Sequence, residues 1–154
     1  MSDEAEVVER LIAVFNYHRV DELRELYAET ARTRRPGWPS EGGIEELMAA
    51  YRMDVAAVPD LHLEVRSTIA EGPYVSTELR ITGANTGPTV LGDFGRALMG
   101  NDVDELPPSG RAIDLNAVFV HEVRDGRVVA ERQYWGLLEY LVQIGVLGGG
   151  AAPP

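Results

Sequence analysis

The spacing of apolar residues changes once along this chain, from the period of a helix to the period of a strand. Before residue 59, apolar side chains recur three and four residues apart, which predicts three helices, beginning near Asp3, Asp21 and Ile44. After residue 60 the pattern is that of strands. Four strand segments form two predicted hairpins: LHLEVRSTIA (61–70) with YVSTELRIT (74–82), and RAIDLNAVFVHEV (111–123) with RVVAERQYW (127–135).

Helices first and an antiparallel sheet later predict the α+β class. We expect three to four helices packed in one strongly curved antiparallel or mixed sheet. Such a sheet makes a cone-shaped α+β barrel with a closed tip and an open mouth. The sequence predicts a single domain over residues 1–147, followed by a flexible tail, GGGAAPP, over 148–154.

Two further segments are predicted to lie around the mouth of the cone. Residues 31–43, ARTRRPGWPSEGG, are punctuated by Pro and Gly and predict a loop. Residues 83–110 are long and rich in Gly and Pro, which predicts a lid with a short helix near 93–99. A last helix is expected over 137–146.

Composition excludes several classes of function. The net charge is −11, which disfavours nucleic acid and anionic membrane surfaces as partners. The chain has no cysteine, so disulfides and thiolate metal sites are excluded. An acidic start and the absence of a long apolar run favour a cytoplasmic protein that does not span a membrane. The three histidines, His18, His62 and His121, lack metal-ligand spacing, so no metal site is predicted.

The Asp125–Gly126 turn predicts which side chains of the last hairpin share a face. A two-residue turn and a regular pleat place His121, Arg132 and Tyr134 on an otherwise apolar face with Phe119. A buried arginine requires a carboxylate partner, such as Glu64 or Glu78, or a water-filled cavity. A shift in register would instead put Arg132 in solvent. The regular pairing opposes His121 to Ala130, Phe119 to Arg132 and Ala117 to Tyr134.

The chain resembles the SnoaL-like polyketide cyclases of the superfamily named after nuclear transport factor two. The resemblance covers most of the chain and is carried by five segments: VPDLHLEV (58–65), TGANTGP (82–88), PPSGRAI (107–113), VRDGRVV (123–129) and LVQIGVL (141–147). It implies the same cone-shaped fold, a small-molecule polyketide-like substrate, a homodimer, and ring closure in a natural-product pathway without metal or organic cofactor.

Departures from the family pattern bear on mechanism. The aspartate that aldol-type cyclases use as acid and base falls on or near Gly136, and the histidine of the family's "GTHTG" turn is Asn85 here. The start of the chain is also similar to ketosteroid isomerases, whose tyrosine and aspartate would align with Leu11 and Arg35. Limonene-type epoxide hydrolases share the fold, and Asp114, Asn116 and Arg132 are loosely similar to their site residues.

Three interpretations follow from these departures. The first is a cyclase that needs little proton transfer, such as one that catalyses a cycloaddition. The second is an acid/base cyclase or isomerase with a relocated base, for which His121 is the candidate. The third is a binding protein without catalysis; a structural dimer module pairing through the face of Asn116, Gln133 and Trp135 also remains open.

Inside the cone, the polar groups are expected to be cationic or neutral, with no carboxylates. The candidate site residues form two groups. The expected catalytic residues are Asn85, His121, Arg132 and Tyr134. The expected substrate-binding residues are Arg35, Trp38, Tyr51, Asn116, Phe119 and Trp135.

Overall fold

The computed structural model describes residues 1–100 and 102–147, and the predicted tail, 148–154, lies outside the described residues. The first helix, α1 (Asp3–Asn16), begins where predicted, although its N-terminus is capped by the hydroxyl of Ser2. The third predicted helix is α3 (Ile44–Ala57), which ends two residues before Pro59. Among the described residues, no helix combines the length and the apolar character needed to cross a bilayer.

The second predicted helix is shorter than expected. It consists of α2 (Val20–Leu23) and a 3-10 turn, η1 (Arg24–Leu26), and the chain enters strand β1 (Tyr27–Arg34) immediately afterwards. The loop predicted over 31–43 is therefore wrong in its first part. The cause is tertiary: β1 pairs in parallel with the last strand, so its backbone hydrogen bonds are supplied from the far end of the chain.

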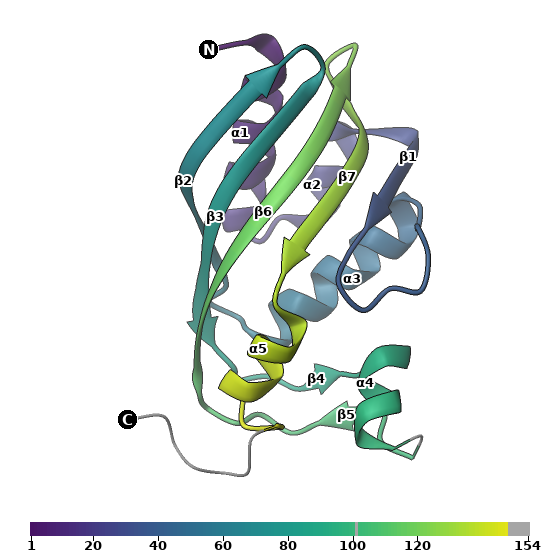
Figure 1. Cartoon of the computed structure of the whole chain (residues 1–154), viewed down its shortest axis with the longest axis vertical. Coiled ribbons are helices and arrows are strands. Elements are labelled where there is room, and N and C mark those ends of the chain that lie inside the picture. The colour runs from purple at the N-terminus through teal and green to yellow at the C-terminus, as the bar shows by residue number, and fades with distance from the viewer. Residues whose placement is uncertain (101, 148–154) are drawn as a thin grey trace.

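The main sheet has five strands in the order β1-β7-β6-β3-β2. Both predicted hairpins are confirmed: β2 (His62–Glu71) pairs with β3 (Tyr74–Ala84), and β6 (Ala112–Arg124) with β7 (Arg127–Trp135). Helices α1, α2 and α3 all lie on one face of the curved sheet (Figure 1). The fold is the predicted cone-shaped α+β class, built on a mixed sheet with β1 and β2 at its two edges.

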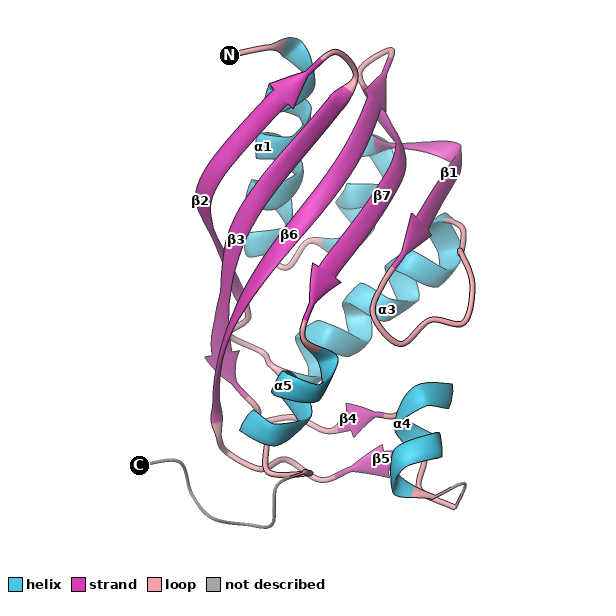
Figure 2. Ribbon diagram, viewed as in Figure 1, coloured by secondary structure: helices cyan, strands magenta, loops and turns pink. Residues whose placement is uncertain are grey.

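The segment predicted as a lid forms a small unit at the wide end of the cone. It contains β4 (Thr89–Val90), α4 (Asp93–Met99) and β5 (Glu105–Leu106), and β4 pairs with β5. The helix predicted near 93–99 is confirmed, whereas the two short strands were not anticipated. Figure 2 shows this unit beside the last helix, α5 (Leu137–Gln143), below the end of β7.

A bulge in the last hairpin changes the faces of β7. The turn at Asp125 and Gly126 has two residues, both with positive φ (51° and 72°), as predicted. The register then shifts, because Val123 pairs with Val128 but Glu122 pairs with Ala130. One extra residue on β7 moves every later side chain of that strand to the opposite face.

The predicted pairs beyond the bulge are therefore wrong. Phe119 opposes Gln133, Ala117 opposes Trp135 and His121 opposes Glu131. Glu131 and Gln133 are buried on the concave face, Trp135 is half-buried, and Arg132 and Tyr134 are exposed.

Candidate active site

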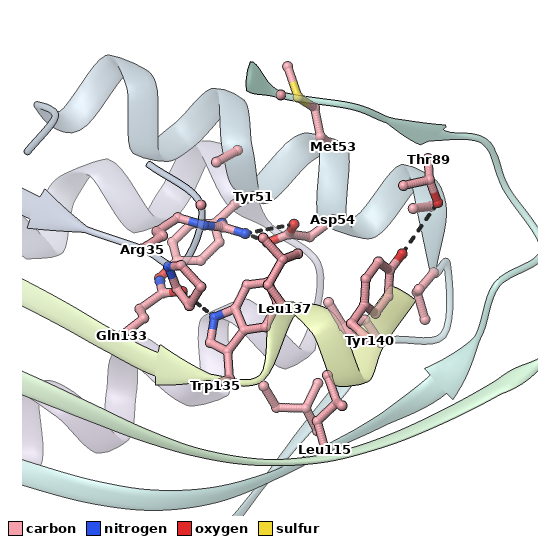
Figure 3. A pocket seen from close by; sticks show the side chains of 18 of the residues that line it. Arg35, Tyr51, Met53, Asp54, Thr89, Leu115, Gln133, Trp135, Leu137 and Tyr140 are labelled. Carbon is pink, nitrogen blue, oxygen red and sulfur yellow. Dashed lines mark hydrogen bonds and ion pairs between the residues drawn. The ribbon is translucent and has the colours of Figure 1, made fainter. Parts of the chain in front are cut away.

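A cavity of about 240 Å³ opens between the sheet, α3, α5 and the lid segment. Its wall is mostly apolar, and its few polar groups form two sets: one lies where β1 and β7 end, and the other is the Thr89–Tyr140 pair on the opposite side (Figure 3). A substrate held here would exchange water for a surface of aliphatic and aromatic side chains. Six of the apolar side chains that form the wall are Phe15, Leu63, Ile81, Leu115, Phe119 and Leu137.

An ion pair between Arg35 and Asp54 is the charged feature of this wall. Arg35 follows β1 and Asp54 lies on α3; the guanidinium donates to both carboxylate oxygens, at 2.7 and 2.9 Å. The side chain of Arg35 is 7% exposed, whereas that of Asp54 is 31% exposed. Asp54 is therefore the more accessible partner. The bidentate geometry fixes its carboxylate, yet leaves lone pairs for another donor.

Two aromatic rings hold the guanidinium of Arg35 in place. It lies 5.7 Å from the ring centroid of Tyr51 and 5.8 Å from that of Trp135. Burial lowers the pKa of Arg35, but the charge of Asp54 and the hydrogen bonds to it outweigh burial and raise the pKa above its usual value. The guanidinium therefore stays charged at all ordinary pH values.

A second carboxylate, Glu131, lies buried beneath the wall. It is 1% exposed and accepts hydrogen bonds from Tyr27 (2.6 Å), Tyr51 (2.9 Å), His121 (2.8 Å) and Gln133 (2.9 Å). Burial raises the pKa of Glu131, but the hydrogen bond and charge of His121, with the other donors, outweigh burial and lower the pKa to about 2. Four donors saturate this carboxylate, so its role is to hold its neighbours.

The polar side chains between Glu131 and the cavity are bonded to one another. Gln133 donates to Glu131 and to the hydroxyl of Tyr51 (3.0 Å), and its oxygen accepts from the indole nitrogen of Trp135 (3.1 Å). Burial and the charge of Glu131 raise the pKa of Tyr51 well above its usual value. Tyr51 and Gln133 thus line the cavity but direct their hydrogen bonds toward Glu131, away from a substrate.

Tyr140, on α5, places a hydroxyl on the opposite side of the cavity. This hydroxyl lies 3.3 Å from the hydroxyl of Thr89 (Figure 3). Burial raises the pKa of Tyr140, the Thr89 hydrogen bond lowers it and the charge of Asp54 raises it, with a net increase. Tyr140 therefore keeps its proton near neutral pH and can donate a hydrogen bond.

The structure brings five of the predicted site residues to the cavity and separates the others. Phe119, Trp38, Tyr51, Arg35 and Trp135 line it, as expected. Arg132 and Tyr134, predicted on the inner face, lie on the outer face because the bulge turns β7 over, and Asn116, expected to bind substrate, lies on the exposed face of β6 away from the cavity. His121 is buried behind the wall, bonded to Glu131.

Asn85 is an anchor of the lid segment. Its side-chain nitrogen donates to the carbonyls of Ala57 and Gly87 and to Thr89, and its oxygen accepts from the backbone and hydroxyl of Ser109. These contacts join both ends of the segment to the end of α3. The side-chain amide of Asn85 is saturated with hydrogen bonds, so it has no free donor or acceptor for the catalytic role expected from the sequence.

The expectation of a hollow without carboxylates is wrong. Asp54 lines the cavity and Glu131 lies beneath it. Gly136 carries no acid and forms the N-cap of α5. Asp54 could have been found from the sequence, because it follows Leu47 by seven residues and Tyr51 by three, on the buried stripe of α3. Among the described residues, no cluster of three or more His, Asp or Glu could hold a metal ion.

The family model of SnoaL-like polyketide cyclases matches residues 5–144. None of the curated proteins compared with the chain matches it. Among solved structures, the chain is similar to AclR, a candidate hydroxylase from Streptomyces galilaeus, at 20% identity and a TM-score of 0.77, covering 96% of this chain and 99% of that chain.

Two further structures share the fold over nearly their whole length. One is a candidate SnoaL-like polyketide cyclase from Jannaschia sp. CCS1, at 26% identity and a TM-score of 0.75, covering 95% of this chain and 94% of that one. The other is IdmH, a candidate polyketide cyclase from Streptomyces antibioticus, at 23% identity and a TM-score of 0.73, covering 93% of this chain and 99% of that one.

Proposed function

Since the chain belongs to the SnoaL-like polyketide cyclase family, we propose that it is an enzyme that closes a ring in a largely apolar, polyketide-like substrate. The observation that carries this proposal is the Arg35–Asp54 ion pair on the wall of an otherwise apolar cavity. An apolar wall holds a folded chain, and a fixed charged pair acts on one polar position of it.

Asp54 is the proposed acid/base. It takes the role of the aspartate of aldol-type cyclases, whose position falls on or near Gly136 in this chain. Its carboxylate removes a proton from the carbon next to a substrate carbonyl. The electron pair of that C–H bond forms the carbon–carbon double bond of an enolate, and the π pair of the carbonyl moves to its oxygen. The enolate carbon then attacks a second carbonyl carbon and forms the new bond. The oxygen of that second carbonyl takes a proton back from Asp54.

Two neighbours support these steps. Arg35 holds the carboxylate in one orientation, and the hydroxyl of Tyr140, which keeps its proton, is the proposed donor to the enolate oxygen. The relocated base of the acid/base interpretation is then Asp54, because His121 is committed to Glu131.

Two alternatives predict a different outcome in heavy water. A cycloaddition would use the cavity to fold the substrate and would exchange no proton with solvent. A non-catalytic binding protein is favoured by the mutual bonding of Gln133, Tyr51 and Trp135, which leaves few free polar groups for chemistry. The homodimer and the cytoplasmic location expected from the sequence stay predictions.

Hydrogen exchange into a simple ketone tests the acid/base chemistry without the natural substrate. The probe is 2-nonanone in D2O, in which removal and return of a proton next to the carbonyl raises the mass. We expect the wild-type protein to accelerate this exchange above the buffer rate. Exchange at the buffer rate, with 2-nonanone bound in the cavity, would contradict an acid/base mechanism and leave cycloaddition or simple binding.

A further inference from the structure

A groove of about 310 Å³ adjoins the cavity where β1 and β7 end. Six residues line both spaces: Arg35, Pro36, Gly37, Trp38, Gln133 and Trp135. The remaining three residues of the groove are Arg34, Arg132 and Tyr134, which are exposed. The groove is therefore an extension of the apolar cavity that carries positive charge at its exposed side.

Arg34 and Arg132 are direct partners in the parallel ladder of β1 and β7. Neighbouring strands lie about 4.8 Å apart, and like charges placed opposite each other on a sheet are destabilising. Elsewhere on the same sheet face, arginines have acidic partners: Arg80 lies 2.7 Å from Asp114, and Arg32 lies 3.6 Å from Glu41. Within residues 1–100 and 102–147, neither Arg34 nor Arg132 has a carboxylate oxygen within 4.0 Å.

This pairing is unusual for a chain with a net charge of −11, which has 25 acidic residues available to neutralise 14 basic ones. Arg35 is not free to bind an anion, because Asp54 occupies its guanidinium from inside the cavity. Among the described residues, the positive charges at the mouth of the cavity that no carboxylate neutralises are therefore those of Arg34 and Arg132.

We propose that Arg34 and Arg132 bind the anionic end of the substrate, a carboxylate or a phosphate, while its apolar chain lies in the cavity. Two guanidinium groups side by side present planar donors that match either oxyanion. The placement of the substrate's apolar chain in the cavity rests on the proposed function. The substrate is then a chain with one charged end, either a free acid or an acyl group attached to a phosphate-bearing carrier.

Binding of three eight-carbon probes tests this proposal by isothermal titration calorimetry. Octanoate and octyl phosphate carry the two candidate anions, and 1-octanol carries none. The variant Arg34→Gln/Arg132→Gln removes both groove charges. Arg10→Gln/Arg66→Gln makes the same change in net charge at exposed positions outside the groove and is the matched control.

We expect at least one anionic probe to bind about tenfold more tightly than 1-octanol. The groove variant removes that advantage and leaves the affinity for 1-octanol unchanged, whereas the control variant keeps it. The anion that binds more tightly indicates which kind of end the substrate carries. Raising the salt concentration weakens the anionic probes and spares 1-octanol.

Three results would overturn the anion site. The first is equal binding of all three probes to the wild-type protein. The second is an equal loss in the groove and control variants, since this would reflect net charge alone. The third is a dimer that dissociates on Arg34→Gln/Arg132→Gln substitution, because the groove would then be covered by a second copy. If no probe binds, 1-octanol included, the role of the apolar cavity in the proposed function is contradicted as well.

Discussion

The carboxylate of Glu131 accepts a hydrogen bond from the hydroxyl of Tyr51 at 2.9 Å, which joins the buried centre of the sheet to the wall of the cavity. The ring of the same tyrosine lies against the guanidinium of Arg35. Glu131 therefore fixes a side chain that in turn helps to fix the Arg35–Asp54 pair. A saturated buried carboxylate of this kind is costly to disturb.

Replacing Glu131 by Gln should destabilise the protein by roughly 3 kcal/mol, because four donors would lose a charged acceptor and the new amide hydrogens would face them. Denaturant unfolding at pH 7 measures the loss. Glu25→Gln is the control, since Glu25 is exposed. Equal stability of the two variants would mean that the buried bonds contribute little.

The effect of Glu131→Gln should depend on pH. The pKa of Glu131 in the folded protein is lowered from its usual 4.5 to about 2, so its stabilising contribution is fully present above about pH 5. The contribution is lost as the pH falls toward 2. The difference in unfolding free energy between wild type and Glu131→Gln should therefore shrink between pH 5 and pH 2. A constant difference would contradict the lowered pKa.

Asn85→Ala should loosen the lid segment and leave the rest of the fold intact. The variant loses five side-chain hydrogen bonds that join residues 87–89 and Ser109 to the end of α3. We expect a loss of roughly 2–4 kcal/mol in stability and faster amide hydrogen exchange over 86–110. Asn116→Ala, on the exposed face of β6, should change neither. Unchanged exchange in Asn85→Ala would contradict its role as an anchor.

Neighbouring residues of β7 should differ in their effect on ligand binding. Trp135 lines the cavity and contacts Arg35, so Trp135→Ala should weaken binding of 2-nonanone by about tenfold or more. Tyr134 lies on the other face with 57% of its surface exposed, and Tyr134→Ala should leave binding within about twofold of wild type. The reverse result would support the regular hairpin register over the bulged one.

The fold was predictable from periodicity, and the faces of β7 were not. The stripe of α3 and the Asp125–Gly126 turn gave the correct helix and the correct hairpin loop. A period-two argument assumes an unbroken pleat, and the strand sequence gives no sign of the extra residue between Val128 and Ala130. The same unbroken register would put Glu131 and Gln133 on the outer face, whereas the bulge turns them inward to bond with Tyr27 and Tyr51 from distant segments.

The candidate site was half predictable for a related reason. Arg35 was expected from the similarity to ketosteroid isomerases and Phe119 from the apolar face of the last hairpin, and both line the cavity. Asp54 was missed because a single acidic residue on a helix normally faces solvent. Its partner Arg35 precedes it by 19 residues and belongs to a different element. Pairing between elements depends on the three-dimensional arrangement, which local spacing does not contain.

The most direct test of the account compares two aspartates that are held in the same way. Asp54 and Asp114 each accept two hydrogen bonds from one arginine, but Asp54 lines the cavity and Asp114 lies on the exposed face of the sheet. The rate of deuterium incorporation into 2-nonanone should fall by roughly 100-fold or more in Asp54→Asn and stay at the wild-type value in Asp114→Asn. Incorporation at the wild-type rate in a folded Asp54→Asn protein would contradict the assignment of Asp54 as the acid/base.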